Sequence, residues 1–341
     1  MKKFIALCLV AVLLCMAFVS CGETAETTAA PETTVAPEAT VAPETTVAPE
    51  TTEAPETTAE PETTAAPETT EPETTEPETE APAPVVAPDA GTFTKMQSVL
   101  LLGQSNMVGC GKAEYVEPIT DDRIYMMRGG EWVPMQEPLH EQTTKASVGL
   151  GASFAKAFVE TFDCEIGLIP VAVGGSGITR WKPNYTGTEE HLYAKAIEMA
   201  KKAQETTEIC AILWHQGETN RNSPTYAKHL KEVLDPMIEE LGLDKDKLVI
   251  ITGELGAWEG KDVSLVNPAL ASIAEENYYP KYAVASQEGL TNIERYDSDS
   301  HFDSPSLRVF GYRYFEAFYE EFMGKECTYE YSQDPDDYRI K

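Results

Sequence analysis

The sequence predicts an α/β fold in which helices cover both faces of a mostly parallel sheet. Residues 91–341 alternate between strand-like and helix-like segments, a pattern typical of parallel sheets. The first of these segments contains four consecutive apolar residues, Val99 to Leu102, which indicates a strand buried on both faces. Several strand-like segments end in glycine and polar residues, and ligands of open α/β sheets bind at such strand ends.

The elements follow one another in a regular order. After a strand at 98–102, a long irregular loop carries a hairpin whose turn is Gly129-Gly130. Phe154, Ala157 and Phe158 share one face at helical spacing and indicate a helix over 150–162. The same periodicities predict strands at 166–173, 209–214, 248–252 and 282–286, and helices at 191–204, 225–241, 268–276 and 305–322.

The first 21 residues have the composition of an export signal. Lys2 and Lys3 precede an apolar run that ends at Val19, too short for a membrane span. The segment Phe18 to Cys21 resembles a bacterial lipobox, although Phe18 stands where leucine is usual. We therefore expect an exported protein whose Cys21 carries a lipid anchor at the bacterial cell surface, with free secretion as the alternative.

Residues 22–90 are built on repeats of alanine, proline, glutamate and threonine. With almost no large apolar side chains, this segment has too little surface to bury to offset the entropy of ordering. Its regular prolines and its glutamates favour an extended spacer. The predicted organisation is a signal at 1–21, a linker at 22–90, a folded domain at 91–330 and a C-terminal tail at 331–341.

The charge and the cysteines exclude several classes of function. The formal net charge is −31, and residues 22–90 contribute 17 acidic and no basic residues. The rest is also acidic, which argues against nucleic acid as a partner. The four cysteines of the folded part lack the close pairing of a zinc site, and their disulfide pairing stays open: Cys110, Cys164, Cys210 and Cys327.

Ser105 directly follows the first strand, between Gly103 and Gly109. A serine at the carboxyl end of a buried strand stands where a nucleophile is expected in this fold class. It is equally consistent with a turn whose serine caps the following helix. This stretch alone supports both interpretations, and the other strand ends decide between them.

The second strand ends in a glycine-rich segment, 174–177, followed by Arg180 and Trp181. Glycines at a strand end let the backbone approach a ligand, and their amides can point at an anion. We expect the Gly175 amide to stabilise an oxyanion and Trp181 to offer a platform for a sugar ring. A tight structural loop is the alternative.

Two further segments carry side chains capable of acid–base chemistry. The third strand ends in His215, Gln216 and Glu218, and His301 precedes the last helix within a run of acidic residues. A lone histidine is most often structural. Acidic neighbours that orient the His301 ring and raise its basicity favour a general base here.

Taken together, four segments resemble the SGNH hydrolase superfamily and, within it, the sialate O-acetylesterase-like branch that includes acetylxylan esterases of carbohydrate esterase family six. The resemblance covers nearly all of residues 96–324 and rests on Gly103-Gln104-Ser105-Asn106-Met107, Gly174-Gly175-Ser176, His215-Gln216-Gly217-Glu218 and His301-Phe302. It implies a three-layer α/β/α sandwich with a flavodoxin-like sheet.

The resemblance also implies roles for individual residues. Ser105 would be the nucleophile and His301 its base, because a serine hydroxyl needs a base within hydrogen-bond reach. The oxyanion donors would be the amides of Ser105 and Gly175 with the side chain of Gln216. The residues expected to contact the substrate are Gln104, Asn106, Arg180 and Trp181. No metal or other cofactor is needed for this chemistry.

The acid of the triad is open between two positions. Many relatives place an aspartate three residues before the histidine, where this chain has Ser298. Glu218 is our first candidate and Asp299 the second, and Glu218 could instead only brace Gln216.

The sequence thus predicts an exported serine esterase that removes O-acetyl groups from a carbohydrate, such as acetylated xylan or sialic acid. Two alternatives remain. One is a non-catalytic carbohydrate-binding lipoprotein that keeps the fold, supported by the absent aspartate at 298. The other is a lipase or thioesterase of the same superfamily, which predicts a wide apolar groove beside Ser105.

Overall fold

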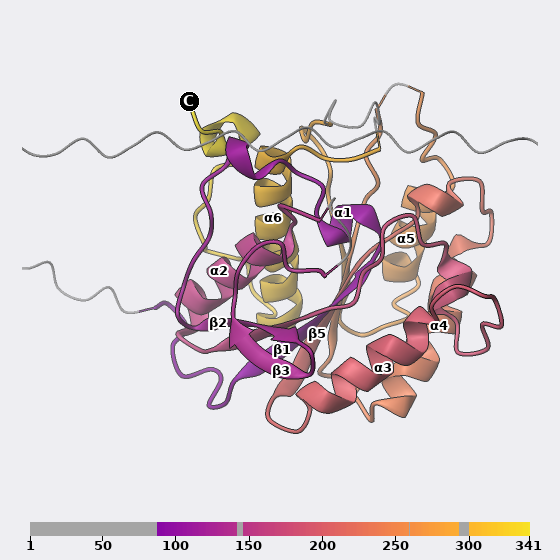
Figure 1. Ribbon diagram of the computed structural model, residues 1–341, viewed down its shortest axis with the longest axis horizontal. Coiled ribbons are helices and arrows are strands. Elements are labelled where there is room, and N and C mark those ends of the chain that lie inside the picture. Colours follow the sequence, from indigo (N-terminus) through magenta and orange to yellow (C-terminus); the bar gives the residue numbers. More distant parts are fainter. Residues whose placement is uncertain (1–86, 142–145, 259, 293–299) are drawn as a thin grey trace, which may run out of the picture. The chain divides into compact units, whose positions relative to one another are not determined.

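A seven-stranded sheet forms the centre of the computed structural model (Figure 1). The structure describes residues 87–141, 146–258, 260–292 and 300–341. The expected signal, Cys21, most of the linker and the segment from Asp297 to Asp299 lie outside these described residues.

The helices and strands fall close to the predicted segments. The strands are β1 (Gln97–Gly103), β2 (Ile124–Arg128), β3 (Glu131–Pro134), β4 (Ile166–Pro170), β5 (Glu208–His215), β6 (Val249–Gly253) and β7 (Tyr282–Ala285). The longer helices are α2 (Gly151–Phe162), α3 (Leu192–Ala203), α4 (Tyr226–Glu240), α5 (Val266–Glu275) and α6 (Ser304–Met323). The short helices are α1 (Ser105–Val108), η1 (Ala113–Tyr115), η2 (Ile178–Trp181), η3 (Glu218–Asn220) and η4 (Pro335–Tyr338).

The order of the strands in space is β3-β2-β4-β1-β5-β6-β7. All neighbouring strands run parallel except β2 and β3, which form the predicted antiparallel hairpin at one edge. Without that hairpin, the five parallel strands have the flavodoxin-like order, in which the chain reverses direction across the sheet between β1 and β5. The predicted α/β fold with a flavodoxin-like sheet is confirmed.

The side chains of β1 alternate between two cores, one on each face of the sheet. Val99 and Leu101 pack in the core under α2 and α6, whereas Leu100 and Leu102 pack in the core under α3, α4 and α5. All four are fully buried, as the apolar run predicts for a central parallel strand. Figure 1 shows the resulting layers, with α3 and α4 on the side of the sheet opposite α2 and α6.

The second parallel strand ends earlier than its apolar run. Regular pairing of β4 stops at Pro170, and the amides of Val171 and Ala172 both donate to the Leu101 carbonyl, at 3.1 and 3.2 Å. Because two successive residues share one acceptor, the chain bulges away from the ladder before the glycine-rich segment.

Both ends of the described chain pack on α6 or its surroundings. Asp89 accepts hydrogen bonds from Tyr319 at 2.7 Å and from Lys325 at 2.9 Å. Near the C-terminus, Arg339 pairs with Asp303 at 3.0 Å, and the Ile340 amide donates to Tyr115 at 2.9 Å. In the part of the chain that the structure describes, no helix combines the length and apolarity that crossing a membrane requires.

Candidate active site

The carboxyl ends of β1 and β5 meet where the sheet reverses its order. Gly103 is paired with His215, and the Gln104 amide donates to the His215 carbonyl at 2.9 Å. Gly103 has φ 139°, and a Cβ there would lie 2.6 Å from the His215 carbonyl carbon. Only glycine lets the two strand ends lie this close, which brings the Ser105 turn against the segment 215–218.

Asn106 links three segments that are far apart in the sequence. Its amide nitrogen donates to Glu218 Oε1 at 2.5 Å and to the Ser300 carbonyl at 2.9 Å. Its amide oxygen accepts from the Phe302 amide at 3.1 Å. The residue next to Ser105 therefore holds both chain neighbours of His301, and it is itself fully buried.

Glu218 is the acidic side chain that the structure brings to this point. The side chain is 4% exposed, and its Oε1 lies 3.3 Å from His215 Nε2. Oε2 is buried and has no hydrogen-bond partner among the described residues. Burial raises the pKa of the Glu218 carboxyl, but its contacts with His215 and Asn106 outweigh this and hold the pKa below the usual range. Glu218 is thus a carboxylate with one oxygen available.

The side chain of Gln216 is enclosed by protein. Its Nε2 lies within hydrogen-bond distance of three acceptors: Gln104 Oε1 at 3.1 Å, the Ser176 carbonyl at 3.1 Å and Asn220 Oδ1 at 2.7 Å. An amide nitrogen carries two hydrogens, so none remains for an oxyanion. In this structure the Gln216 side chain braces the loops, and its expected role as an oxyanion donor stays a prediction.

The side chains of two expected substrate contacts are likewise buried and hydrogen-bonded to protein groups. Gln104 is 3% exposed, and its Oε1 accepts from Gln216 and from the Thr219 amide at 3.3 Å. The side-chain amide of Asn106 makes the three hydrogen bonds given above. Both residues were expected to touch the substrate, but their polar side chains connect protein segments beneath the site.

Asn220 also belongs to the site, although its sequence context predicts no role for it. Its Oδ1 accepts from Gln216 Nε2 and from the Ile178 amide at 2.9 Å, which fixes the direction of the side chain. The Nδ2 end therefore stays available as a donor. Its spacing of four residues after Gln216 is the only sequence signal that could have pointed to it.

The glycine-rich segment after β4 and the residues that follow it include both exposed and buried positions. Gly175 is exposed, has φ 68°, and would have no atom within 4 Å of a Cβ. Trp181 has 0% exposure, donates to Ser176 Oγ at 3.2 Å and packs edge-on against Trp214. The expected sugar platform at Trp181 is therefore wrong, because its ring belongs to the core.

Arg180 is held by acidic neighbours on its own loop. Its guanidinium pairs with Glu189 at 3.2 Å and donates to the Glu190 carbonyl at 3.3 Å. The guanidinium group is therefore engaged by protein groups rather than offered to a ligand.

A cavity of about 530 Å³ opens beside Glu218. Its lining is mostly polar: Glu218, Thr219, Asn220, Arg221, Asn222, Ser223, Gly260 and Asp262. Hydroxyl, amide and carboxylate groups in this density suit a ligand with many hydroxyls better than an acyl chain.

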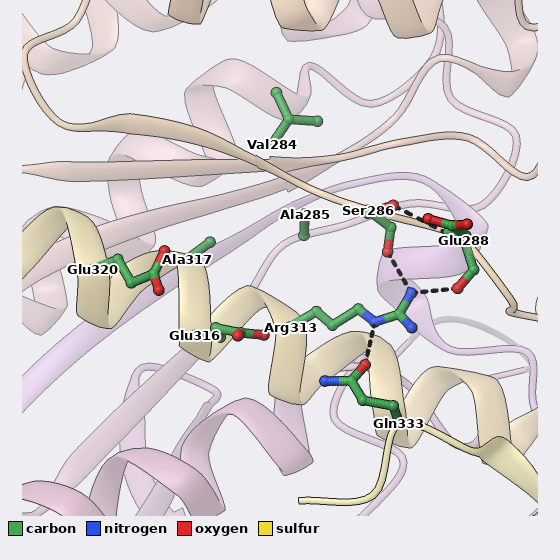
Figure 2. A pocket seen from close by; sticks show the side chains of 9 residues that line it. All are labelled: Val284, Ala285, Ser286, Glu288, Arg313, Glu316, Ala317, Glu320 and Gln333. Carbon is green, nitrogen blue, oxygen red and sulfur yellow. Dashed lines mark hydrogen bonds between the residues drawn. The ribbon is translucent and has the colours of Figure 1, made fainter. Parts of the chain in front are cut away.

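A second pocket, of about 350 Å³, lies at the β7 edge (Figure 2). Arg313 donates there to the carbonyls of Ser286 and Glu288, at 2.9 and 2.7 Å, and to Gln333 at 3.0 Å. These bonds tie the C-terminal segment to β7 and α6. The lining contains none of the predicted catalytic residues, so this pocket is not the candidate site.

One cysteine contacts the Ser105 turn, because the Cys110 thiol donates to the Ser105 carbonyl at 3.5 Å. Cys164, Cys210 and Cys327 are free thiols. Burial raises the pKa of the Cys210 thiol well above its usual value, which makes it unreactive at neutral pH.

Comparison with solved structures shows the same fold. A protein from Arabidopsis thaliana has a TM-score of 0.56 and 22% identity, covering 68% of this chain and 100% of that one. NanS has a TM-score of 0.53 and 15% identity, covering 71% of this chain and 100% of that one. A carbohydrate acetylesterase from Xanthomonas citri has a TM-score of 0.50 and 19% identity, covering 68% of this chain and 57% of that one.

Sequence comparison places the chain more narrowly. A probable carbohydrate esterase of Arabidopsis thaliana is 28% identical over 173 residues, which span 43% of this chain and 65% of that relative. The chain thus matches slightly less than two thirds of that relative's length. Residues 95–320 match a family model described as carbohydrate esterase, sialic acid-specific acetylesterase. This match covers well over half of the chain, which therefore belongs to the sialic acid-specific acetylesterase family of carbohydrate esterases.

Proposed function

We propose that this protein is a serine esterase that removes O-acetyl groups from a carbohydrate. Family membership supports the substrate class. The observation that carries the mechanism is the hydrogen bonding of Asn106, the neighbour of Ser105, to Glu218 and to both chain neighbours of His301.

The proposed reaction has two steps. Ser105 Oγ attacks the acetyl carbonyl, and His301 takes the hydroxyl proton and passes it to the departing sugar oxygen. Water, activated by the same imidazole, then attacks the acetyl-serine ester and releases acetate. A serine without such a base is a poor nucleophile at neutral pH.

Glu218 is the proposed acid of the triad. Its buried carboxylate has an oxygen, Oε2, without a hydrogen-bond partner among the described residues, and its lowered pKa keeps it charged. A carboxylate in this state can accept the second ring N–H of His301 and stabilise the imidazolium. Asp299, the second candidate, lies outside the described residues.

The oxyanion that forms on the acetyl group needs donors in place before the reaction. We propose the amides of Ser105 and Gly175 for this task, with the Asn220 amide group in place of Gln216. The exposed position of Gly175 and the fixed direction of Asn220 support this choice.

The polar cavity beside Glu218 is the proposed binding site for the sugar. It supports a glycan ester over a long-chain acyl ester, which would need an apolar groove. Acetylated sialic acid and acetylated xylan are the substrates to compare, and the acetylxylan esterase branch remains a prediction. We further propose that the protein is exported and anchored by a lipid on Cys21, as its first 21 residues suggest.

The first experiment compares Ser105→Ala with Ser286→Ala, an exposed serine in the separate pocket at the β7 edge. Acetate release from acetylated xylan, acetylated sialic acid and 4-nitrophenyl acetate should vanish in the first variant and persist in the second. A serine-directed fluorophosphonate should label the wild type only at Ser105. Retained acetate release in Ser105→Ala would remove this serine from the mechanism, and absence of both labelling and turnover in the wild type would favour a binding protein.

A second experiment separates the two candidate acids. Glu218→Gln should lower kcat by about 10²-fold or more, because the imidazolium of His301 loses its counter-charge. Asp299→Asn should retain most activity. The reverse result would assign the triad acid to Asp299.

A further inference from the structure

A buried imidazole lies directly behind Glu218, and the steps proposed above do not use it. His215 ends β5 and is fully buried. Its ring is packed against the rings of Phe302, Phe310 and Tyr314, with centroids 5.3 to 6.4 Å apart. Because water is excluded from such surroundings, the two ring nitrogens depend on protein partners.

The first ring nitrogen has a tyrosine hydroxyl as its partner. His215 Nδ1 lies 2.9 Å from the Tyr314 hydroxyl, and that hydroxyl donates to the Trp214 carbonyl at 3.1 Å. The hydroxyl has one hydrogen to share between these two acceptors. When the Trp214 carbonyl takes it, Nδ1 carries a hydrogen and donates to Tyr314.

Space for this contact is reserved by a glycine on the neighbouring strand. A Cβ on Gly253, the last residue of β6, would lie 2.6 Å from His215 Nδ1 and would overlap the Tyr314 hydroxyl. The absence of that atom lets the histidine and the tyrosine meet.

The second ring nitrogen faces a carboxylate. His215 Nε2 lies 3.3 Å from Glu218 Oε1 and has no hydrogen-bond partner among the described residues. A neutral ring with its hydrogen on Nδ1 would turn a lone pair toward a negative oxygen in a water-excluded site. One additional proton on Nε2 replaces this repulsion with an ion pair, and the pair as a whole is then electrically neutral.

We propose that His215 is a positioning residue that acts as an imidazolium, with hydrogens on both ring nitrogens. It balances the charge of Glu218, holds Oε1 together with Asn106, and leaves Oε2 for His301. This inference rests on the proposed function, in which Glu218 is the triad acid.

The titratable groups that face the ring are few. Among the described residues they are Glu218 on η3 and Tyr314 on α6, while β6 contributes Gly253 and the segment before α6 contributes Phe302. Removing the imidazolium would leave Glu218 buried without its counter-charge, and burial then favours the protonated acid.

The direct test is the protonation of His215 in the full-length protein. The chain has five histidines, so a long-range ¹H–¹⁵N spectrum of ¹⁵N-histidine-labelled protein at pH 7 is tractable, with His215→Gln as the assignment control. We expect two protonated ring nitrogens for His215 in the wild type and in Ser105→Ala. A His215 signal with only Nε2 protonated would mean that Tyr314 donates to the ring, and would overturn the proposal.

Kinetics test the consequence for catalysis. His215→Gln keeps a neutral donor near Oε1, whereas His215→Ala keeps none. We expect kcat to fall by about 10²-fold in His215→Ala with partial rescue in His215→Gln, and KM to change by less than about 3-fold. The acid limb of the kcat profile should move to higher pH in both variants. An unchanged acid limb would overturn the positioning role.

Tyr314→Phe and Tyr319→Phe form a matched pair on α6. The first removes the acceptor of His215 Nδ1, and the second removes a hydroxyl that bonds Asp89. Only the first should shift the acid limb, and equal behaviour of the two would count against the proposal. Failure of the proposed function would show separately, as acetate release by Ser105→Ala, without altering the His215 spectrum.

Discussion

The side chain of Asn106 makes three hydrogen bonds to two other segments of the chain, and it touches neither solvent nor the cavity. These bonds fix Glu218 and the backbone around His301 relative to Ser105. The site is assembled from distant segments, and one buried amide keeps the distances between them. This matters because catalytic groups must be held to well within 1 Å of their productive positions.

Asn106→Ala should therefore lower kcat by about 10²-fold while the fold persists. The truncation leaves the Phe302 amide without its acceptor and Glu218 without its amide donor, so we also expect a loss of about 1–3 kcal/mol in the free energy of unfolding. Turnover of 4-nitrophenyl acetate and urea unfolding measure the two effects, with the exposed Asn184→Ala as control. Near-wild-type turnover in Asn106→Ala would contradict the role given to this amide.

At this scale the sequence predicted which residues gather and was less successful with what each one does. Motif order brought Ser105, Glu218 and the surroundings of His301 to one place. The motifs could not show that the Gln216 amide nitrogen donates to protein acceptors, or that the Trp181 ring is buried. Side-chain direction depends on packing across the strand ends, which residue spacing does not encode.

The elements that matter most are β1 and β5, whose ends touch at Gly103. A Cβ there would overlap the His215 backbone, and φ 139° is itself unfavourable for other residues. This contact is what places the Ser105 turn against Glu218.

Gly103→Ala should cost about 3 kcal/mol or more in unfolding free energy, through backbone displacement and strain. Gly129→Ala is the matched control, since Gly129 also has a positive φ, 56°, but nothing within 4 Å of a Cβ. The control should cost about 1 kcal/mol. Urea denaturation of both variants provides the measurement, and equal losses would show that overlap with His215 is not decisive.

The strands and longer helices were predictable because buried parallel strands and amphipathic helices leave strong periodic signals. The one-turn helix η3, which carries Glu218 and Asn220, was not predicted. It is held by contacts from Gln104 and Gln216 rather than by any periodic pattern of its own.

For the whole molecule, His140 links stability to pH. It is 2% exposed, and burial lowers its pKa to about 3, against the opposing influence of the Leu101 and Val108 backbone. The unfolded chain takes up a proton below pH 6.5, which the folded chain resists until about pH 3. Folding stability is therefore complete above pH 6.5 and declines as the pH falls toward 3, by about 1.4 kcal/mol per pH unit for this group.

Replacing His140 should flatten this dependence. We expect His140→Leu to lose less stability than the wild type between pH 7 and pH 4, measured as urea midpoints at each pH. His229→Gln, a partly exposed histidine on α4, should retain the wild-type slope. Parallel slopes for His140→Leu and the wild type would exclude His140 as the source.

The attachment of Asp89 to Tyr319 and Lys325 has a mechanical consequence. Helix α6 begins three residues after His301 and has 20 residues, so it extends about 30 Å. Asp89 is hydrogen-bonded at the C-terminal end of this helix. A force applied through the chain that precedes residue 87 would therefore act on the end of α6 remote from Ser105, and the reaction centre would keep its geometry until the Asp89 contacts break.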